Sequence, residues 1–327
     1  MTESVGHYQL YDLRLKSGDS LSLSKWSGEP EEDWRFEVGE VSESSGALVH
    51  DILDFDGVRR LKVWVEEERG IIFSHGGTRV LWDRVNKVIR FQAGQDLEIR
   101  PAIVLERMVA PIAMILERAG FVALHASAVG KVAGRAWIFI GNSGAGKSTT
   151  ALQMMRRGFD LLADDLVMID AGKTPGGKQE LIAATPSLRL FDRPETVPEA
   201  IDKELVMPHI EKFWYQLPDR SGGRKRHEIA GIFSLEPTDN EEFVGGPELK
   251  EVRGQEASMR ILAQAFDLTD GPGPWRTQRF RTLCEVARSV PVYAVRYRRD
   301  SSEAPAQVVA IAEHLSRNRA AEEEGIR

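Results

Sequence analysis

Cysteine is nearly absent from this sequence, and several other signals are missing with it. The single cysteine, Cys284, excludes a disulfide within the chain. No run of about 18 apolar residues is present, which argues against a membrane-spanning helix. Residues 1–4 show neither the basic nor the apolar segment of a signal peptide. These absences predict a protein of the reducing cytoplasm, with Cys284 as a small buried apolar residue.

An excess of basic residues is also missing. The chain has 43 Lys and Arg against 50 Asp and Glu, a net charge of −7. This balance argues against nucleic acid or an anionic membrane as the main partner. The apolar share of 42% and the charged share of 28% are those of an ordinary globular protein. A length of 327 residues predicts about two domains.

The spacing of apolar residues changes near Arg100. Before it, segments 61–65 and 88–91 alternate apolar and polar residues as half-buried strands do, and glycines separate them as turns would. After it, apolar residues recur at helical spacing over 105–116, with Gly120 as the end of the helix. Pro111 either kinks this helix or starts its second half. We predict a β-rich N-terminal domain over 1–104, an α/β domain over 105–320 and a flexible tail over 321–327.

The predicted α/β domain contains alternating strands and helices. Residues 136–140 form a nearly continuous apolar run of the buried-strand type, followed by a glycine-rich loop and a helix over 147–157. A final helix is predicted around 308–315. The other predicted strands are 121–129, 160–163, 166–169, 181–191, 231–235 and 291–297.

The loop between strand and helix has the phosphate-binding pattern G-x-x-x-x-G-K-S, the Walker A pattern. Glycines let backbone N–H groups point at phosphate oxygens, and the helix start adds a positive end. Lys147 supplies a charge for the β- and γ-phosphates, and the Ser148 hydroxyl can bind Mg²⁺. The pattern therefore predicts an ATP or GTP site with Mg²⁺. Its predicted nucleotide-binding residues are Gly141, Asn142, Ser143, Gly144, Ala145, Gly146, Lys147, Ser148 and Thr149.

Two adjacent aspartates, Asp164 and Asp165, begin 17 residues after Lys147, beyond one helix and one short strand. Adjacent side chains of an extended segment point to opposite sides. One carboxylate can then hold Mg²⁺ while the other faces an incoming hydroxyl. We assign Asp164 to the hydroxyl and Asp165 to the metal, although adjacency alone leaves the reverse open. A solvated turn is the alternative for the pair. Asp170 is the alternative metal ligand, but the turn after it places it at the far end of its strand.

These motifs together resemble a known family. The segments are Leu124-His125-Ala126-Ser127-Ala128-Val129, the phosphate loop, and Leu162-Ala163-Asp164-Asp165. In this order they resemble the catalytic domain of bacterial HPr kinase/phosphorylase and the wider group of HPr-kinase-like serine kinases, over about 105–320. The resemblance implies an α/β P-loop kinase domain related in fold to ATP-dependent phosphoenolpyruvate carboxykinases, here preceded by the small β-rich domain.

The resemblance also implies a chemistry. It predicts Mg²⁺-dependent transfer of the γ-phosphoryl group of ATP to a seryl hydroxyl, with Lys147, Asp164, Asp165 and His125 as catalytic residues, and possible homo-oligomers. The chain departs from the family at Thr149, where the family has glutamate. Residues 184–191 stand where the family has a glycine-rich signature with a functional glutamate. These departures argue against HPr as the acceptor and against the reverse phosphorolysis, without deciding either.

Two sets of basic residues could neutralise charge on a transferring phosphoryl group. Arg224, Lys225 and Arg226 follow two glycines and could close over the triphosphate, although a solvated loop is the favoured interpretation. Arg189 is the second source. The predicted function is a kinase acting on a serine-type hydroxyl of a protein, peptide or small molecule. A nucleotide-dependent regulatory module with slow or no hydrolysis is the alternative, and a carboxykinase-type enzyme is a third.

Overall fold

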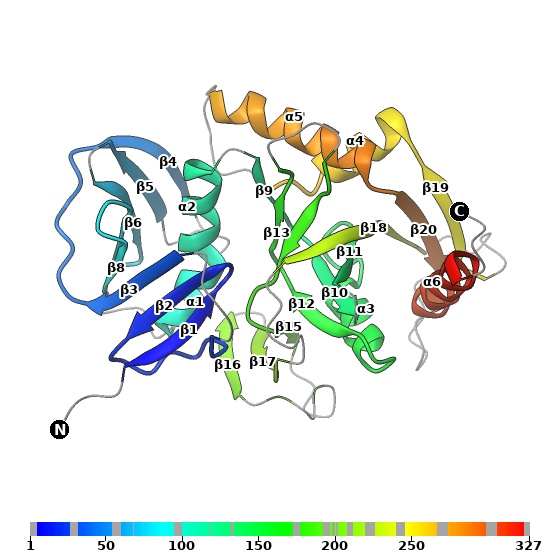
Figure 1. Cartoon of the computed structure of the whole chain (residues 1–327), viewed down its shortest axis with the longest axis horizontal. Coiled ribbons are helices and arrows are strands. Elements are labelled where there is room, and N and C mark those ends of the chain that lie inside the picture. The colour runs from blue at the N-terminus through cyan, green and yellow to red at the C-terminus, as the bar shows by residue number, and fades with distance from the viewer. Residues whose placement is uncertain are drawn as a thin grey trace.

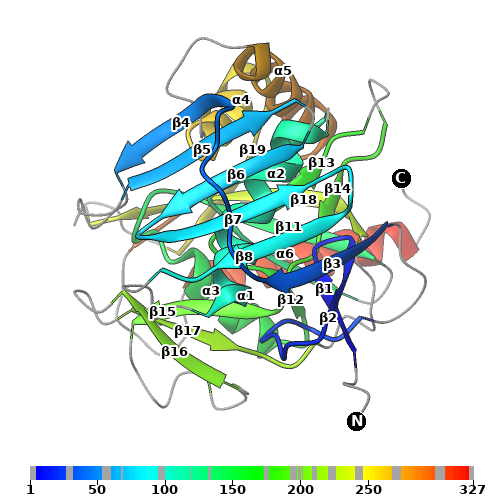
Figure 2. The same cartoon turned by 90° about the vertical axis from the view of Figure 1, so that its left-hand side faces the viewer.

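The first hundred residues of the computed structural model form one eight-stranded sheet, in the order β1-β2-β3-β8-β7-β6-β5-β4. Figure 2 looks onto this sheet. Its core includes Trp34 and Trp82, whose ring centroids lie 4.5 Å apart. The predicted strands 61–65 and 88–91 are confirmed as β5 and β8. The strands are β1 (Gly6–Leu10), β2 (Leu13–Ser17), β3 (Glu32–Val38), β4 (Ala47–Leu53), β5 (Arg60–Glu66), β6 (Gly70–His75), β7 (Thr78–Asp83) and β8 (Val88–Gln92).

The structure describes most residues of the chain. They are 5–26, 32–53, 60–67, 69–94, 100–118, 120–131, 134–172, 177–191, 197, 200, 202–207, 212–219, 226–239, 246–266, 274–298 and 306–323.

A continuous helical stretch joins the first sheet to the rest of the molecule (Figure 1). It consists of α1 (Pro101–Val104), the π-helical turn η1 (Leu105–Val109) and α2 (Ala110–Glu117). This confirms the predicted helix, with Pro111 at the start of its second half, directly after the π-helical turn. The stretch is almost wholly apolar, and one hydrophobic core continues from the first sheet through it into the second. The predicted boundary at 104/105 falls inside this stretch.

The second sheet has the order β12-β10-β11-β18-β14-β13-β9, with β20 beside β18 and β19 beside β20. It mixes parallel and antiparallel pairs, as β11 is parallel to β18 but antiparallel to β10. The chain is therefore mixed α/β, as predicted. The strands are β9 (Phe121–Leu124), β10 (Ser127–Lys131), β11 (Arg135–Ile140), β12 (Asp160–Ala163), β13 (Val167–Asp170), β14 (Glu180–Ile182), β18 (Arg226–Thr238), β19 (Glu248–Val252) and β20 (Val292–Arg298).

Helices cover both faces of the second sheet (Figure 1). Along β11, Ile138 and Ile140 pack in the core that includes α4 and α5, whereas Phe139 packs in the core that includes α3 and α6. This alternation is the two-residue period of a strand buried on both sides. The helices are α3 (Lys147–Met155), α4 (Gly254–Leu262), α5 (Pro274–Ser289) and α6 (Ala306–Glu323).

Several sequence-based boundaries are corrected. The single strand expected over 121–129 is two strands, β9 and β10, and the one expected over 181–191 is β14 and β15, which lie in different sheets. The strand β15 (Ser187–Phe191) belongs to a third sheet with β17 (Lys212–Gln216) and β16 (Asp202–Met207). Apolar pattern cannot reveal that a chain changes sheets.

Two further expectations differ from the structure. The helix α6 continues to Glu323, into the segment expected to be a flexible tail. Cys284 is half-buried rather than fully buried, because it lies at the edge of the buried face of α5. Among the helices described, none is both long enough and apolar enough to cross a membrane.

Candidate functional site

The candidate site lies at a break in an antiparallel ribbon. Leu124 of β9 pairs with Val167 of β13, and Ala128 of β10 pairs with Ala163 of β12. The two pairs continue one antiparallel register. The β9–β13 ladder and the β10–β12 ladder are therefore two parts of a single two-stranded ribbon, whose pairing is interrupted at 125–127 and 164–166. This interruption sets His125 and Ser127 opposite the two aspartates. The break that sequence periodicity missed is therefore the feature that builds the site.

The backbone turns sharply within the break. Asp165 has a φ of 72°, in the left-handed region, which aspartate tolerates better than most residues. Asp164 just before it keeps its side chain in the interior. The two neighbouring carboxylates are therefore presented to different surroundings.

Both oxygens of the Asp164 carboxylate accept hydrogen bonds from the protein. Its Oδ1 accepts a hydrogen bond from the Ser127 hydroxyl at 2.5 Å, and its Oδ2 accepts one from the Arg189 backbone N–H at 2.9 Å. The residue is only 2% exposed. Asp164, which the sequence assigned to the acceptor hydroxyl, is thus buried, and both of its oxygens hold the ribbon to β15; its role toward an acceptor stays a prediction.

The carboxylate of Asp165 is the more open of the two, with 20% of its side chain exposed. Its Oδ2 accepts a bond from Arg189 Nη1 at 2.5 Å and lies 3.9 Å from Arg107 Nη1. Its Oδ1 lies 3.9 Å from Nδ1 of the half-exposed His125. Asp165 is thus the carboxylate around which cationic groups converge.

The glycine-rich loop (residues 141–146) lies at the same edge of the sheet. β11 and β12 both pair antiparallel with β10, so they run in one direction and end together. Ser127, which bonds to Asp164, pairs directly with Phe139, next to the residue that precedes the loop. The ribbon break and the loop are therefore neighbours, as the sequence predicted for the aspartates.

The loop has a backbone that only glycine adopts easily. Gly141, Gly144 and Gly146 have φ values of 150°, 78° and 82°. A Cβ on Gly141 would also meet the Leu235 carbonyl oxygen at 2.8 Å. The hydroxyl of Tyr297 donates to the Ala145 carbonyl at 2.5 Å, which ties the loop to β20. The loop is thus held in shape by its glycines and by a neighbouring strand.

Lys147 opens α3 and turns back onto the loop. Its ammonium donates to the Gly141 carbonyl at 2.8 Å and to the Asn142 carbonyl at 3.3 Å, and the residue is 8% exposed. Ser148 follows in the first turn and is half-buried. The other predicted loop residues, Asn142, Ser143, Gly144 and Thr149, are exposed. A buried ammonium with exposed loop atoms beside it suits an anionic ligand.

The end of α4 and the residues just after it contact the site. The Gln264 carbonyl accepts a bond from the His125 backbone N–H at 2.8 Å, and the Gln264 amide lies 3.5 Å from Asn142 Oδ1. One turn earlier, Arg260 donates to the Ser234 hydroxyl at 3.1 Å. Ser234 pairs with Ile140, the residue before the loop. Sequence patterns gave no sign of this helix as part of the site.

Arg107 is a further site residue that the motifs missed. It lies in η1 and donates to the Asp164 carbonyl and, at 2.7 Å, to the Ser187 hydroxyl. It is therefore anchored independently of Asp165. π-helical turns occur often at functional sites. A charged pair, Glu106-Arg107, inside an otherwise apolar helix was the signal available in the sequence.

Glu106, its neighbour, is a buried carboxyl between the N-terminal sheet and the site. Its Oε1 accepts a bond from the Thr185 backbone N–H at 2.5 Å, and its backbone carbonyl accepts one from the Tyr11 hydroxyl at 2.8 Å. Burial raises the pKa of Glu106, while Arg107 and the bond from Thr185 act in the opposite direction. Burial also raises the pKa of Tyr11.

We expect Glu106 to make the protein less stable as pH rises. Its pKa is raised in the folded state, so its stabilising contribution is complete below the unfolded pKa, about 4.5, and is lost as pH rises through the folded pKa. Glu106→Gln should remove this loss. Denaturant unfolding between about pH 4.5 and 7.5 should show the variant gaining stability relative to wild type as pH rises. Glu248→Gln, on exposed β19, is the control; parallel curves for Glu106→Gln and wild type would contradict the prediction.

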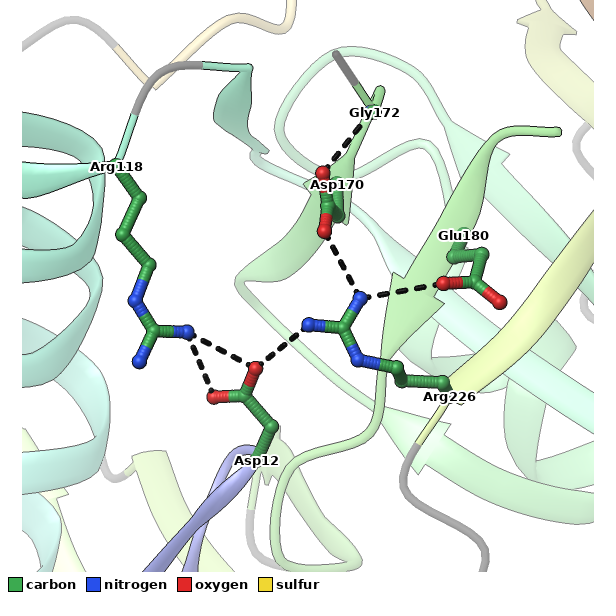
Figure 3. A network of polar contacts seen from close by, with 6 residues as sticks. All are labelled: Asp12, Arg118, Asp170, Gly172, Glu180 and Arg226. Atoms are coloured by element: carbon green, nitrogen blue, oxygen red, sulfur yellow. Dashed lines mark hydrogen bonds and ion pairs between the residues drawn. The ribbon is translucent and has the colours of Figure 1, made fainter. Parts of the chain in front are cut away.

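Arg226 and Asp170 lie in a separate network (Figure 3). Arg226 donates to Asp12 at 2.8 Å, to Asp170 at 2.9 Å and to Glu180 at 3.2 Å, and Arg118 donates to Asp12 at 3.0 Å. Asp170 ends β13, whereas Asp165 precedes the start of that strand. The structure therefore keeps Arg226 and Asp170 away from the ribbon break. Arg224 and Lys225 lie outside the described residues.

Hard oxygen donors at the loop fit a magnesium ion. Mg²⁺ in nucleotide sites takes one or two protein ligands and completes its shell with phosphate and water. The Ser148 hydroxyl and the Asp165 carboxylate are donors of this kind. Within the described part of the chain, no group of three or more His, Cys, Asp or Glu gathers as an all-protein metal site would.

Comparisons with known proteins add little to this geometry. No protein-family model matches the sequence, and no curated protein matches it. Among solved structures, the chain is similar to the Hpr(Ser) kinase/phosphatase from Coxiella burnetii, at 15% sequence identity and a TM-score of 0.32. The similarity covers 62% of this chain and 93% of that chain. Because a likeness at this level carries no functional argument, inference about function depends on the chain's own residues.

Proposed function

We propose that this chain is an ATP-dependent P-loop kinase that transfers the γ-phosphoryl group to a serine-type hydroxyl of a protein, peptide or small molecule. The observation that carries the proposal is the pairing of two features at one sheet edge. These are the glycine-rich loop with the buried Lys147 ammonium and the ribbon break that exposes Asp165. Loop and lysine suit a triphosphate, and a carboxylate beside them suits phosphoryl transfer.

The proposed division of labour follows the contacts. Backbone N–H groups of the loop and the start of α3 bind phosphate oxygens, and Lys147 neutralises charge on them. Ser148 and Asp165 would hold Mg²⁺, which supplies charge neutralisation between phosphates when bound. Asp164 positions the turn through Ser127 and the Arg189 backbone. His125, whose Nδ1 lies 3.9 Å from Asp165 Oδ1, would orient the acceptor hydroxyl. Catalysis would then be mostly positioning and electrostatic stabilisation.

A regulatory nucleotide-binding module is the second candidate. The observation in its favour is that Asp165 Oδ2 is already paired with Arg189 at 2.5 Å, so neither aspartate presents a carboxylate without a partner. Incubation with radiolabelled ATP and cell extract, then separation of protein, peptide and small-molecule fractions, decides between the two. Labelled phosphoserine or a labelled small alcohol supports the kinase. Tight ATP binding with no labelled product in any fraction supports the module.

Lys147→Ala tests the nucleotide site itself. The variant should lose a charge-assisted phosphate contact worth roughly 1.5–3 kcal/mol, which lowers ATP affinity about 10- to 150-fold. Calorimetry with ATP and Mg²⁺ measures this. Lys178→Ala is the control, since Lys178 is exposed and pairs with Glu228. Equal affinity of wild type and Lys147→Ala would rule out the loop as the nucleotide site.

A further inference from the structure

The side chain of Arg189 is bonded to an oxygen of Asp165, the carboxylate that would hold a cation at this site. Arg189 Nη1 donates to Asp165 Oδ2 at 2.5 Å, and both side chains are mostly buried. A magnesium ion binds a carboxylate oxygen at about 2.0–2.1 Å. Because a guanidinium and a divalent cation on one oxygen repel each other, binding of the cation to Oδ2 displaces the arginine.

Arg189 differs from its neighbour Arg107 in how it is held. Arg107 bonds to the Asp164 carbonyl and the Ser187 hydroxyl, so it stays in place without Asp165. Within the described residues, the Arg189 side chain bonds to Asp165 alone. Of the two arginines at Asp165, Arg189 is the one that loses its side-chain bond when Asp165 binds something else.

The backbone of Arg189 keeps the displaced side chain at the site. Its N–H is bonded to Asp164 Oδ2 at 2.9 Å, and its strand β15 pairs with β17 through Trp214. The same Asp164 carboxylate bonds to Ser127, which pairs with Phe139 beside the glycine-rich loop. A guanidinium released here stays attached to a backbone that is bonded to the ribbon break, and its planar fork matches phosphate oxygens.

We propose that Arg189 is an exchange residue: it pairs with Asp165 when nucleotide and cation are absent, and it moves to the transferring phosphate when a divalent cation takes Asp165. The inference rests on the proposed function and deepens it. Binding of a cation at Asp165 would free the Arg189 guanidinium to stabilise negative charge on the phosphoryl group in the transition state. Before the cation binds, the guanidinium neutralises Asp165. After it binds, the same guanidinium stabilises charge on phosphate oxygens.

The exchange predicts opposite effects of one substitution on two measurements. Arg189→Gln removes the competing charge from Asp165, so Mn²⁺, used as the probe for Mg²⁺, should bind the nucleotide-free protein about 3- to 10-fold more tightly by electron paramagnetic resonance titration. Turnover with ATP should fall about 10³-fold, as for a phosphate-contacting arginine. A purely structural ion pair predicts weaker Mn²⁺ binding instead, because the site would loosen.

Arg107→Gln is the matched comparison. Arg107 also lies near Asp165 Oδ2 but anchors the turn, so this variant should bind Mn²⁺ more weakly than wild type. Arg189→Lys keeps the positive charge but lacks the planar guanidinium. It should bind Mn²⁺ as wild type does, yet turn over ATP slowly. This variant replaces Arg189→Gln as the test if Arg189→Gln does not fold.

Failure of the exchange and failure of the kinase proposal can be told apart. Unchanged or weaker Mn²⁺ binding by Arg189→Gln overturns the exchange even when the wild type transfers phosphate. If Arg189→Lys turns over ATP as fast as wild type, the exchange is also overturned. Tighter Mn²⁺ binding by Arg189→Gln, with no phosphoryl transfer by the wild type, supports cation competition at Asp165 and overturns the kinase function together with the phosphate step.

Discussion

Replacing Asp165 with Asn should lower phosphoryl transfer by about 10²- to 10⁴-fold, because loss of a metal ion's charge stabilisation costs several kcal/mol, while the protein stays folded. Asparagine tolerates the left-handed backbone that Asp165 adopts, so the turn survives. The substitution removes the charge that attracts Arg189 and would bind Mg²⁺. ATP affinity should change only a few-fold, because the loop and Lys147 carry it, but the Mg²⁺ dependence of binding should weaken. Single-turnover assays and calorimetry measure the two effects.

Asp164→Asn is the natural comparison, and its effect should be of another kind. Asp164 is buried and bonds to Ser127 and to the Arg189 backbone, so the amide loses one acceptor and the charge that strengthens both bonds. The midpoint of thermal unfolding should drop more in this variant than in Asp165→Asn, because Asp164 is buried whereas 20% of the Asp165 side chain is exposed. A stable Asp164→Asn protein without activity, beside an active Asp165→Asn protein, would support the assignment made from sequence.

The second large effect is expected at Asp12, far along the chain from the candidate site. Asp12→Ala should lower the free energy of unfolding by about 3–5 kcal/mol, since it removes one partner of a buried ion cluster. Only 1% of the Asp12 side chain is exposed, and it accepts bonds from Arg118 and Arg226 (Figure 3). The variant leaves Arg118 without this acceptor. Urea unfolding followed by tryptophan fluorescence measures the change.

Asp33 offers a matched control for Asp12. It too contacts two cations, with Arg14 at 2.5 Å and Lys16 at 2.9 Å, but 38% of its side chain is exposed. The bonds from Arg14 lower the pKa of Asp33 despite its exposure. Solvent-exposed ion pairs contribute about 1 kcal/mol or less, so Asp33→Ala should be mild. Equal losses for the two variants would show that burial of the Asp12 cluster contributes nothing.

The Asp12 cluster also bears on how the two sheets are joined. Asp12 comes from the β1–β2 hairpin, while Arg118 follows α2 and Arg226 begins β18. Gln9 of the same hairpin donates to the Ala183 carbonyl at 3.1 Å, just before the segment that carries Thr185 and Arg189. The N-terminal sheet therefore supports the strands of the candidate site directly. The loss of stability in Asp12→Ala should extend to the site, which nucleotide protection against thermal unfolding would report.

Sequence by itself determined the parts of this protein that depend on neighbours along the chain. The spacing of Gly141, Gly146 and Lys147 after a buried strand predicted the loop, and helix α3 begins where the pattern placed it. Apolar periodicity found the helical stretch before Gly120, most strands of the second sheet and two strands of the first, β5 and β8, because these signals are local.

Tertiary structure alone decided which aspartate is open and what surrounds it. The contacts of Asp164 and Asp165 join residues separated by 57 positions to Arg107, 37 to Ser127 and 24 to Arg189. Such partners depend on strand register and on where one ribbon breaks, and a uniform apolar pattern over 121–129 carries neither. Because adjacent carboxylates look alike in sequence, their roles follow from burial and from distant cations, which only the folded chain brings together.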